Sequence, residues 1–224
     1  RRPPTQHAMH KSLHKVLAIE HLTDRTFSIR IERNGLRFTA GQCVNIGLPN
    51  AGVNREYSSY SGENDPDLRF LIRTVDGGQV STRLRGLRAG DFVEVDGAYG
   101  LFTIADPADT SRKYVFVATG TGIAPFHCFV KSYPGIDYRI IHGTALRSED
   151  YNRGDYPPDR YVHCVSREAG GDFHGRVTDY LKAHPQPADA MYYLCGNRNM
   201  INDVYDILRE QGVSGSNIVT EVFF

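Results

Sequence analysis

The sequence predicts two domains, an antiparallel β-barrel over residues 1–107 followed by a doubly wound α/β domain over residues 108–224. Three observations carry this prediction. Short segments of alternating apolar residues, separated by turn signals, fill the first half up to about Val95, which is typical of an antiparallel barrel or sandwich. From about Lys113, strand-like and helix-like segments alternate, as in doubly wound folds. The third is a strand, a glycine turn and a helix start in succession at 114–125.

The length and charge of the chain limit the classes of protein to which it can belong. Its 224 residues suit two small domains, and 40% hydrophobic residues can fill their cores. Lys plus Arg and Asp plus Glu both number 26, whereas a nucleic-acid binder is usually basic. No apolar run is long enough to cross a membrane, and no apolar segment follows the first arginines. We therefore expect a cytoplasmic protein that binds neither nucleic acid nor membrane.

Four cysteines are spread along the chain, at positions 43, 128, 164 and 195. None forms a C-x-x-C pair, which argues against a zinc ribbon and against a local iron–sulfur loop. A chain this long does not need disulfides for stability. We expect reduced thiols and no metal site.

Four β-strands are expected in the first half after a loose tail at residues 1–10. Apolar residues alternate along residues 26–31, 44–48, 68–73 and 92–95. Glycine and asparagine turns separate these segments. One short helix is expected to begin near Ser81 and to end before Gly86.

Five strands and three helices are expected in the second half. The strands are expected at 114–119, 138–142, 161–165, 191–194 and 218–223, and the helices at 125–131, 176–183 and 199–211. The last helix is the clearest, because Met200, Val204, Ile207 and Leu208 follow helical spacing and Gly212 is a natural stop.

The glycine turn G-T-G-I-A-P at 120–125 is the segment around which the second half is organised. It follows a buried strand and leads into a helix, whose first turn tolerates Pro125. Backbone amides at such a turn can bind a pyrophosphate, and glycine allows a ligand to approach closely. Many glycine turns simply connect a strand to a helix.

Two segments of the first half have the chemistry of a phosphate or ring site. In R-E-Y-S-S at 55–59, Arg55 can clamp a phosphate, Tyr57 can stack on a flat ring, and Ser58 can bond a ring nitrogen. An ordinary polar strand edge explains this segment equally well. In D-G-G-Q-V-S-T at 76–82, Ser81 or Thr82 is expected to cap a helix whose free N–H groups could hold a pyrophosphate. A hairpin turn before a capped helix is the ordinary explanation.

Three segments of the second half follow expected strands. Ser166, Arg167 and Arg176 suit a 2′-phosphate, and Arg147 could add a third charge; a solvated charged loop is the alternative. In C-G-N at 195–197, Gly196 would admit a ligand to the backbone, although a buried structural cysteine is the simpler interpretation of Cys195. The ending E-V-F-F could close a core or cover a ring, with the Glu221 carboxylate relaying protons.

Taken together and in this order, the segments resemble the motifs of the ferredoxin–NADP⁺ reductase family in its bacterial and plastid branches. R-E-Y-S-S and G-Q-V-S-T are similar to its flavin and flavin-phosphate motifs. G-T-G-I-A-P, S-R-E with Arg176, C-G-N and E-V-F-F resemble its nucleotide loop, its NADP-phosphate site, its nicotinamide-side motif and its terminal glutamate with aromatics. At 97–102 the chain has G-A-Y-G-L-F, without the proline that the family often has there.

The resemblance implies that the barrel binds FAD and the α/β domain binds NADP(H). FMN stays possible because the chain is short, although the G-Q-V-S-T form favours FAD. The implied FAD-binding residues are Arg55, Tyr57, Ser58, Ser59, Gly78, Val80, Ser81, Thr82, Phe223 and Phe224. The implied NADP-binding residues are Gly120, Thr121, Gly122, Pro125, Ser166, Arg167, Arg176, Cys195, Gly196 and Asn197. The implied catalytic residues are Ser58, Cys195, Glu221 and Phe223, the last of which would cover the flavin and move for the nicotinamide.

The implied function is a flavoprotein oxidoreductase that transfers electrons between NADPH, as a hydride, and a one-electron carrier such as ferredoxin or flavodoxin. The family is mostly monomeric, so a monomer is expected. Two alternatives stay open. One is the reductase component of an oxygenase system, and the other is a flavin or nucleotide sensor without turnover.

Overall fold

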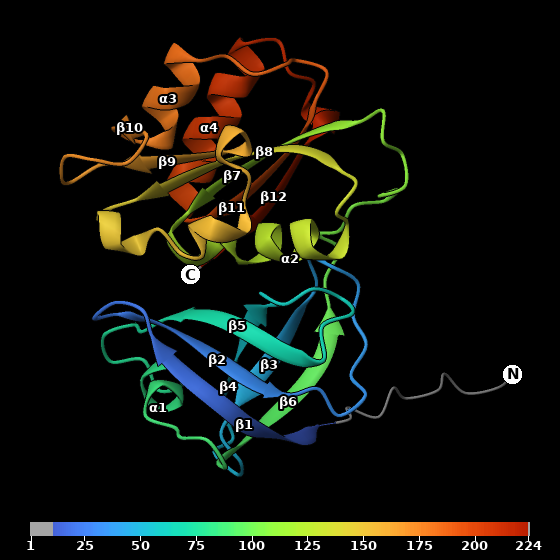
Figure 1. The fold of residues 1–224 in the computed structure, drawn as a ribbon, viewed down its shortest axis with the longest axis vertical. Coiled ribbons are helices and arrows are strands. Elements are labelled where there is room, and N and C mark those ends of the chain that lie inside the picture. The colour runs from blue at the N-terminus through green and yellow to red at the C-terminus, as the bar shows by residue number, and fades with distance from the viewer. Residues whose placement is uncertain (1–10, 224) are drawn as a thin grey trace, which may run out of the picture.

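The computed structural model describes residues 11–223, which form two units stacked end to end (Figure 1). The N-terminal unit is a β-sheet with one short helix, and the C-terminal unit is a parallel sheet with helices on its two faces. The expected tail at residues 1–10 and Phe224 lie outside the described residues. None of the described helices is long and apolar enough to cross a membrane.

The N-terminal sheet has six antiparallel strands in the order β4-β3-β6-β1-β2-β5. Its elements are β1 (Ser12–His21), β2 (Thr26–Glu32), β3 (Cys43–Gly47), β4 (Asn54–Ser58), β5 (Asp67–Arg73), α1 (Ser81–Arg85) and β6 (Phe92–Tyr99). The ladder does not close between β4 and β5. Instead the chain just after β4 bonds to β5, because the Tyr60 N–H donates to the Arg69 carbonyl oxygen at 2.7 Å and the Arg69 N–H donates to Ser61 Oγ at 3.0 Å. The sheet is therefore barrel-like.

The four expected strands and the short helix of this unit are confirmed. β4 was not among the four, and neither was β1. Its inward positions include a fully buried polar residue, His14. The His14 ring bonds to Ser12 Oγ and to the Glu32 carbonyl oxygen, both at 2.7 Å. A register shift also interrupts the pairing between Val16 and Ala18. Both features break the apolar alternation that marks a strand.

The C-terminal sheet is parallel, in the order β10-β9-β8-β7-β11-β12. Its elements are β7 (Lys113–Thr119), α2 (Ala124–Ser132), β8 (Asp137–Thr144), β9 (Tyr161–Val165), β10 (Phe173–His174), α3 (Val177–Ala183), β11 (Met191–Gly196), α4 (Arg198–Glu210) and β12 (Ile218–Val222). Every strand and helix expected here is present, which confirms the doubly wound fold. Between β8 and β9 the chain makes three 3-10 turns, η2 (Arg147–Glu149), η3 (Arg153–Asp155) and η4 (Pro158–Arg160), which the sequence pattern did not indicate.

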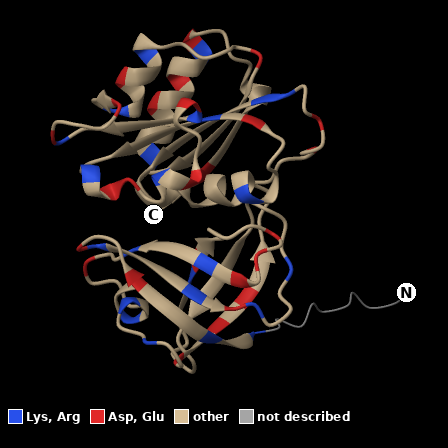
Figure 2. Ribbon diagram, in the orientation of Figure 1, with Lys and Arg blue, Asp and Glu red and all other residues tan. Residues whose placement is uncertain are grey.

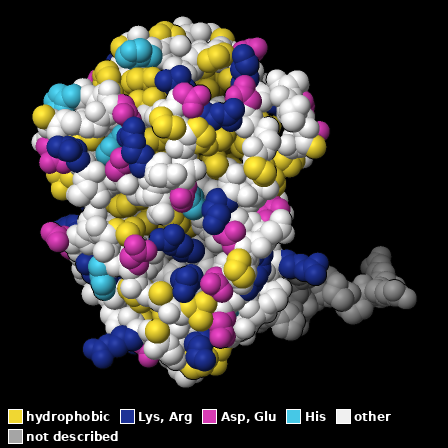
Figure 3. Space-filling model, in the orientation of Figure 1, with side chains coloured by type: hydrophobic (Ala, Val, Ile, Leu, Met, Phe, Trp, Pro, Cys, Tyr) yellow, Lys and Arg dark blue, Asp and Glu magenta, His cyan; other side chains and the backbone are white. Residues whose placement is uncertain are grey.

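The two units share one apolar cluster. Aromatic residues of the lower face of the parallel sheet and of α2, such as Phe116 and Phe126, pack in the same cluster as Tyr60 and Phe102 of the N-terminal unit. α2 lies on the side that faces the N-terminal unit (Figure 1), whereas α3 and α4 cover the other face of the sheet. Acidic and basic residues are interspersed over both units (Figure 2), and the face in Figure 3 shows no large area of one charge.

Candidate functional site

A cavity of about 340 Å³ lies at the carboxyl ends of β7, β8, β9 and β11. Ligands of open α/β sheets bind at this edge, where the strand order reverses. The cavity gathers residues predicted from separate segments of the sequence. Those that line it are Gly120, Ser166, Arg167, Arg176 and Asn197. Thr121, Gly122 and Pro125 are not among the lining residues, although they lie in the adjoining turn and the start of α2.

Two arginines form the basic end of this cavity. The Arg167 N–H donates to the Ala145 carbonyl oxygen at 3.1 Å, and the Arg176 N–H donates to Asp179 Oδ2 at 2.9 Å. These backbone bonds hold the two residues in place, while both side chains are exposed. Among residues 11–223, no ion pair involves either guanidinium group. Both guanidinium groups are therefore free to clamp a phosphate, beside the exposed residue Ser166.

The glycine turn is a 3-10 turn, η1 (Gly120–Ile123), that leads directly into α2. Gly120 has a φ of +54°, and an added Cβ there would meet no atom within 4 Å. Gly122 differs, since an added Cβ would lie 2.4 Å from the Cys195 carbonyl oxygen. At Gly196 it would lie 2.2 Å from Thr119 Oγ1. Gly122 and Gly196 therefore allow two chain segments to pack closely.

Asn197, Pro125 and Thr121 have structural positions beside the cavity. The Asn197 side chain caps α4, with Oδ1 accepting from the Met200 N–H at 2.9 Å and Nδ2 lying 3.2 Å from Thr119 Oγ1. Pro125 is buried in the first turn of α2, as the sequence predicted. Thr121 is half-buried within η1.

On the N-terminal unit, Arg55 and Tyr57 lie on the same face of β4. Arg55 is exposed, and Tyr57 is half-buried against the apolar cluster that contains Val80 and Leu84 of the α1 segment. Burial raises the pKa of Tyr57 to about 12, so its hydroxyl stays neutral. The structure thus brings the R-E-Y-S-S and G-Q-V-S-T segments together. The Ser59 hydroxyl is buried and bonded to Ser61.

The prediction that Ser81 or Thr82 caps α1 is wrong. Val80 occupies the N-cap position, and no side chain caps the helix. Ser81 is buried inside the first turn, where its Oγ accepts from the Val75 N–H at 3.1 Å, and Thr82 is exposed. The turn before the helix requires Gly78, since an added Cβ would lie 2.9 Å from the Val75 carbonyl oxygen. The first-turn N–H groups of α1 consequently have no side-chain partner.

Ser58 and Glu221 join the two units. Ser58 ends β4, Glu221 lies on β12, and the Ser58 hydroxyl donates to Glu221 Oε2 at 3.3 Å. Burial raises the pKa of Glu221 from its ordinary value of 4.5 to about 7; the Ser58 hydrogen bond opposes this rise and Glu56 adds to it. A carboxyl group with this pKa can hold or release a proton near neutral pH.

We expect the raised pKa of Glu221 to give a measurable pH dependence of stability. Between pH 4.5 and about 7 the unfolded chain has lost this proton whereas the folded chain keeps it. The free energy of unfolding should therefore fall as pH rises through this window. Urea unfolding at several pH values should show this fall in the natural protein and a flatter profile in Glu221→Gln. The exposed Glu210→Gln is the control, and equal profiles for all three proteins would contradict the assignment.

Cys195 is paired with Glu221 in the parallel sheet, and Phe223 follows Glu221 by two residues. The Cys195 thiol is fully buried, and burial, with Glu221 nearby, holds its pKa well above the ordinary value. It is therefore a neutral thiol, and all four cysteines are free and buried. The Phe223 N–H donates to the Gly196 carbonyl oxygen at 2.8 Å, and its ring packs, half-buried, against the cluster between the units.

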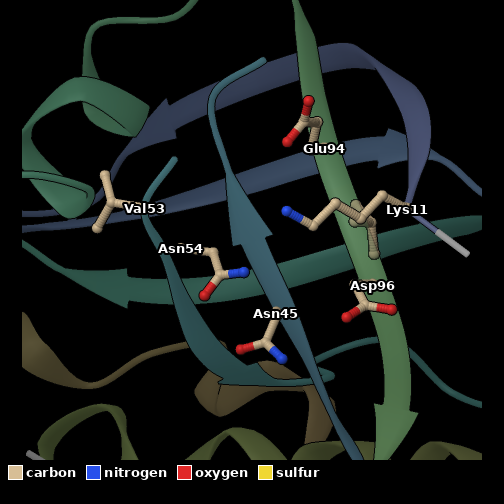
Figure 4. A pocket seen from close by; sticks show the side chains of 7 residues that line it. Lys11, Asn45, Val53, Asn54, Glu94 and Asp96 are labelled. Atoms are coloured by element: carbon tan, nitrogen blue, oxygen red, sulfur yellow. The ribbon is translucent and has the colours of Figure 1, made fainter. Parts of the chain in front are cut away.

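Sequence reasoning missed Arg73, which lines the 340 Å³ cavity although it belongs to β5 of the other unit. The available signal was weak: a charged residue at the end of an alternating strand. A second hollow, lined by Lys11, Asn45, Asn54, Glu94 and Asp96 among others, lies on the N-terminal sheet (Figure 4). Its volume is about 10 Å³, room for about one water molecule, so it cannot hold a cofactor.

Comparison with known proteins agrees with this geometry. The family model described as the oxidoreductase FAD-binding domain matches residues 13–104. Ferredoxin--NADP reductase A of Sorangium cellulosum is 30% identical over 235 residues, covering 90% of this chain and 84% of that protein. The toluate 1,2-dioxygenase electron transfer component of Pseudomonas putida is 29% identical over 222 residues, covering 92% of this chain. This chain spans only 65% of that protein's length.

A solved structure has the same fold. It is a ferredoxin NADP⁺ reductase from Neisseria gonorrhoeae with bound FAD and NADP, which superposes with a TM-score of 0.87 at 23% identity. The match covers 97% of this chain and all of the other. At this identity the likeness concerns the fold.

Proposed function

Because the chain belongs to the ferredoxin–NADP reductase family of FAD-binding oxidoreductases, we propose that it transfers electrons between NADPH and a one-electron carrier protein such as ferredoxin or flavodoxin. The observation that best supports the NADPH part is the cavity at the sheet edge. It is lined both by Gly120 of the glycine turn and by Arg167 and Arg176, whose guanidinium groups are free. A dinucleotide with a 2′-phosphate has negative charge at both of these places.

The N-terminal unit fits FAD in two respects. Arg55 and Tyr57 share one face of β4, and the first turn of α1 has no side-chain cap. Arg55, Ser81 and Thr82 would hold the pyrophosphate, assisted by Gly78 and Val80, and Tyr57 would lie against the flavin ring. Ser58 and Ser59 would lie at the ring edge. Bound flavin supplies the conversion between two-electron and one-electron transfer.

The C-terminal unit would orient NADP(H) across the sheet edge. Ser166, Arg167 and Arg176 would bind the 2′-phosphate, and the turn from Gly120 to Gly122 the pyrophosphate. Arg73 lines the cavity from β5 and would add a positive charge from the flavin-binding unit. A charge from each unit at one cavity favours a nucleotide held across their junction.

Glu221, Ser58 and Phe223 would act where the two cofactors meet. The carboxyl group, with its pKa of about 7, can hold or release a proton while its Oε2 accepts the hydrogen bond from Ser58. The half-buried Phe223 ring would cover the flavin and move aside for the nicotinamide. The buried Cys195 thiol would support this contact from behind as a neutral group. These roles follow from position and protonation.

We assign the flavin to residues 1–107 and the nucleotide to residues 108–224. We propose a cytoplasmic monomer, and the four free thiols support a reducing compartment. The reductase component of an oxygenase is the second candidate function, favoured by the similarity to the toluate dioxygenase component.

NADPH-dependent reduction of ferricyanide, followed by assays with separate carrier proteins, tests this function. We expect ferricyanide reduction with NADPH and faster turnover with ferredoxin or flavodoxin than with an oxygenase iron–sulfur component. A preference for the oxygenase component would favour the second candidate. Binding of flavin and nucleotide without ferricyanide reduction would contradict both and indicate a sensor.

A further inference from the structure

His127 lies where the flavin-side strand and the nucleotide-side helix meet. It belongs to α2, two residues after Pro125, on the helix that faces the N-terminal unit (Figure 1). Its side chain is 3% exposed. The ring stacks on Tyr60, two residues after Ser58, with 4.0 Å between ring centroids and 19° between planes. His127 therefore links the residues that follow the G-T-G-I-A-P turn to the residues that follow R-E-Y-S-S.

Both ring nitrogens of His127 face hydrogen-bond acceptors. Nδ1 lies 2.5 Å from the backbone carbonyl oxygen of Tyr60, and Nε2 lies 2.8 Å from Asp155 Oδ2 on η3. A carbonyl oxygen can only accept. The Asp155 carboxylate also only accepts when ionised, and the hydrogen bond from His127 is the main cause that lowers the pKa of Asp155. A neutral imidazole carries one N–H, so it can satisfy only one of these two partners.

We propose that His127 is a doubly protonated positioning residue, which fixes the flavin-binding strand against the nucleotide-binding helix through two charge-assisted hydrogen bonds. One bond runs to the backbone of the flavin-side segment, and the other to the carboxylate of Asp155. The protonation state rests on geometry alone, whereas its effect on electron transfer rests on the proposed function. This contact fixes the distance between the R-E-Y-S-S and G-T-G-I-A-P segments, while His127 itself touches neither cofactor.

The groups around the ring act on a positive charge there in opposite directions. Asp155 is the acidic group in direct contact, and its side chain is 46% exposed. The Tyr60 and Tyr156 rings flank the imidazole, Tyr156 edge-on at 5.9 Å. Burial raises the pKa of both phenols above the ordinary value, so both are neutral. Two cations oppose the charge from further away: the Arg69 Cζ atom lies 5.5 Å from the centroid of the Tyr60 ring, and Lys131 is paired with Asp65 at 2.6 Å.

Nitrogen-15 NMR of the histidine rings tests the protonation state directly and needs neither cofactor nor turnover. Comparison with His127→Gln identifies the His127 resonances among the nine histidines. We expect both ring nitrogens of His127 to be protonated at neutral pH. We expect the ring resonances of His127 to shift in Asp155→Asn, because the charge-assisted hydrogen bond to the carboxylate is lost. The exposed Asp159→Asn is the matched control and should not differ from the natural protein.

A His127 ring with one proton at neutral pH would overturn the inference. An Asp155→Asn variant whose His127 ring resonances match those of the natural protein would overturn the charge pairing. Since Asp155 is half-exposed, this variant should fold even if His127→Gln does not.

The positioning role is tested by separating nucleotide binding from electron transfer. In His127→Gln, one amide cannot reach both acceptors, so we expect flavin reduction at saturating NADPH to slow by about tenfold, the scale of one charge-assisted bond. The dissociation constant for 2′,5′-ADP should be unchanged, because Arg167 and Arg176 stay in place. A weakened constant with an unchanged rate would contradict the role. If the natural protein is not reduced by NADPH, the proposed function fails, while the NMR result still decides the protonation state.

Discussion

Replacing Arg167 by alanine is expected to lower kcat/KM for NADPH by roughly 10- to 100-fold, the cost of losing one charge-assisted hydrogen bond to a phosphate. The guanidinium group lines the cavity and has no ion-pair partner among the described residues, so its charge is available to the ligand. NADH lacks the 2′-phosphate, and its kcat/KM should therefore be unchanged. Steady-state kinetics with both coenzymes measures the change in preference.

The exposed Lys182→Ala on α3 is the matched control for Arg167→Ala. It also removes one positive charge from the same unit, but Lys182 does not line the cavity. This variant should retain the natural preference for NADPH. An Arg167→Ala protein that keeps the full preference would contradict the assignment of the basic end of the cavity.

Replacing Gly122 by alanine is expected to reduce the free energy of unfolding by about 3 kcal/mol, because overpacking against rigid backbone forces a segment to shift. The added Cβ would lie 2.4 Å from the Cys195 carbonyl oxygen and 2.9 Å from the Gly196 Cα. For a chain of this length the melting temperature should fall by roughly 6–12 °C. Thermal unfolding measures the change.

Gly120→Ala provides the comparison within the same turn. Its Cβ would meet no neighbour, and only its φ of +54° opposes the substitution, so the loss should be about 1 kcal/mol. Because Gly120 lines the cavity, this variant should instead weaken nucleotide binding. Equal stability losses in the two variants would contradict the distinction between a packing glycine and a cavity glycine.

The parts of the fold that the sequence predicted are those with regular local periodicity. Met200, Val204 and Leu208 are buried on one face of α4, and Gly212 ends the segment with a φ of +88°. The β1 strand was not predicted because His14 occupies an inward position that is normally apolar. The three 3-10 turns between β8 and β9 have no repeat in apolar residues, so no pattern could indicate them.

The candidate site was predictable where its residues belong to local motifs, and unpredictable where it depends on how the two units pack. Ser166, Arg167 and Gly120 each follow a strand of one parallel sheet, so their meeting at one edge follows from the fold. Arg73 reaches the same cavity from the other unit, and the contact between His127 and Tyr60 joins residues 67 positions apart. Such contacts depend on the packing of one domain on another, which sequence spacing does not encode.

The visible absorption spectrum of the purified protein under argon, before and after addition of NADPH or NADH, tests whether the protein carries a flavin that NADPH reduces. We expect a flavin spectrum that bleaches much faster with NADPH than with NADH, since Arg167 and Arg176 would select the 2′-phosphate. A colourless protein that acquires no flavin spectrum after addition of FAD or FMN would contradict the flavin assignment. Faster bleaching with NADH would contradict the coenzyme assignment.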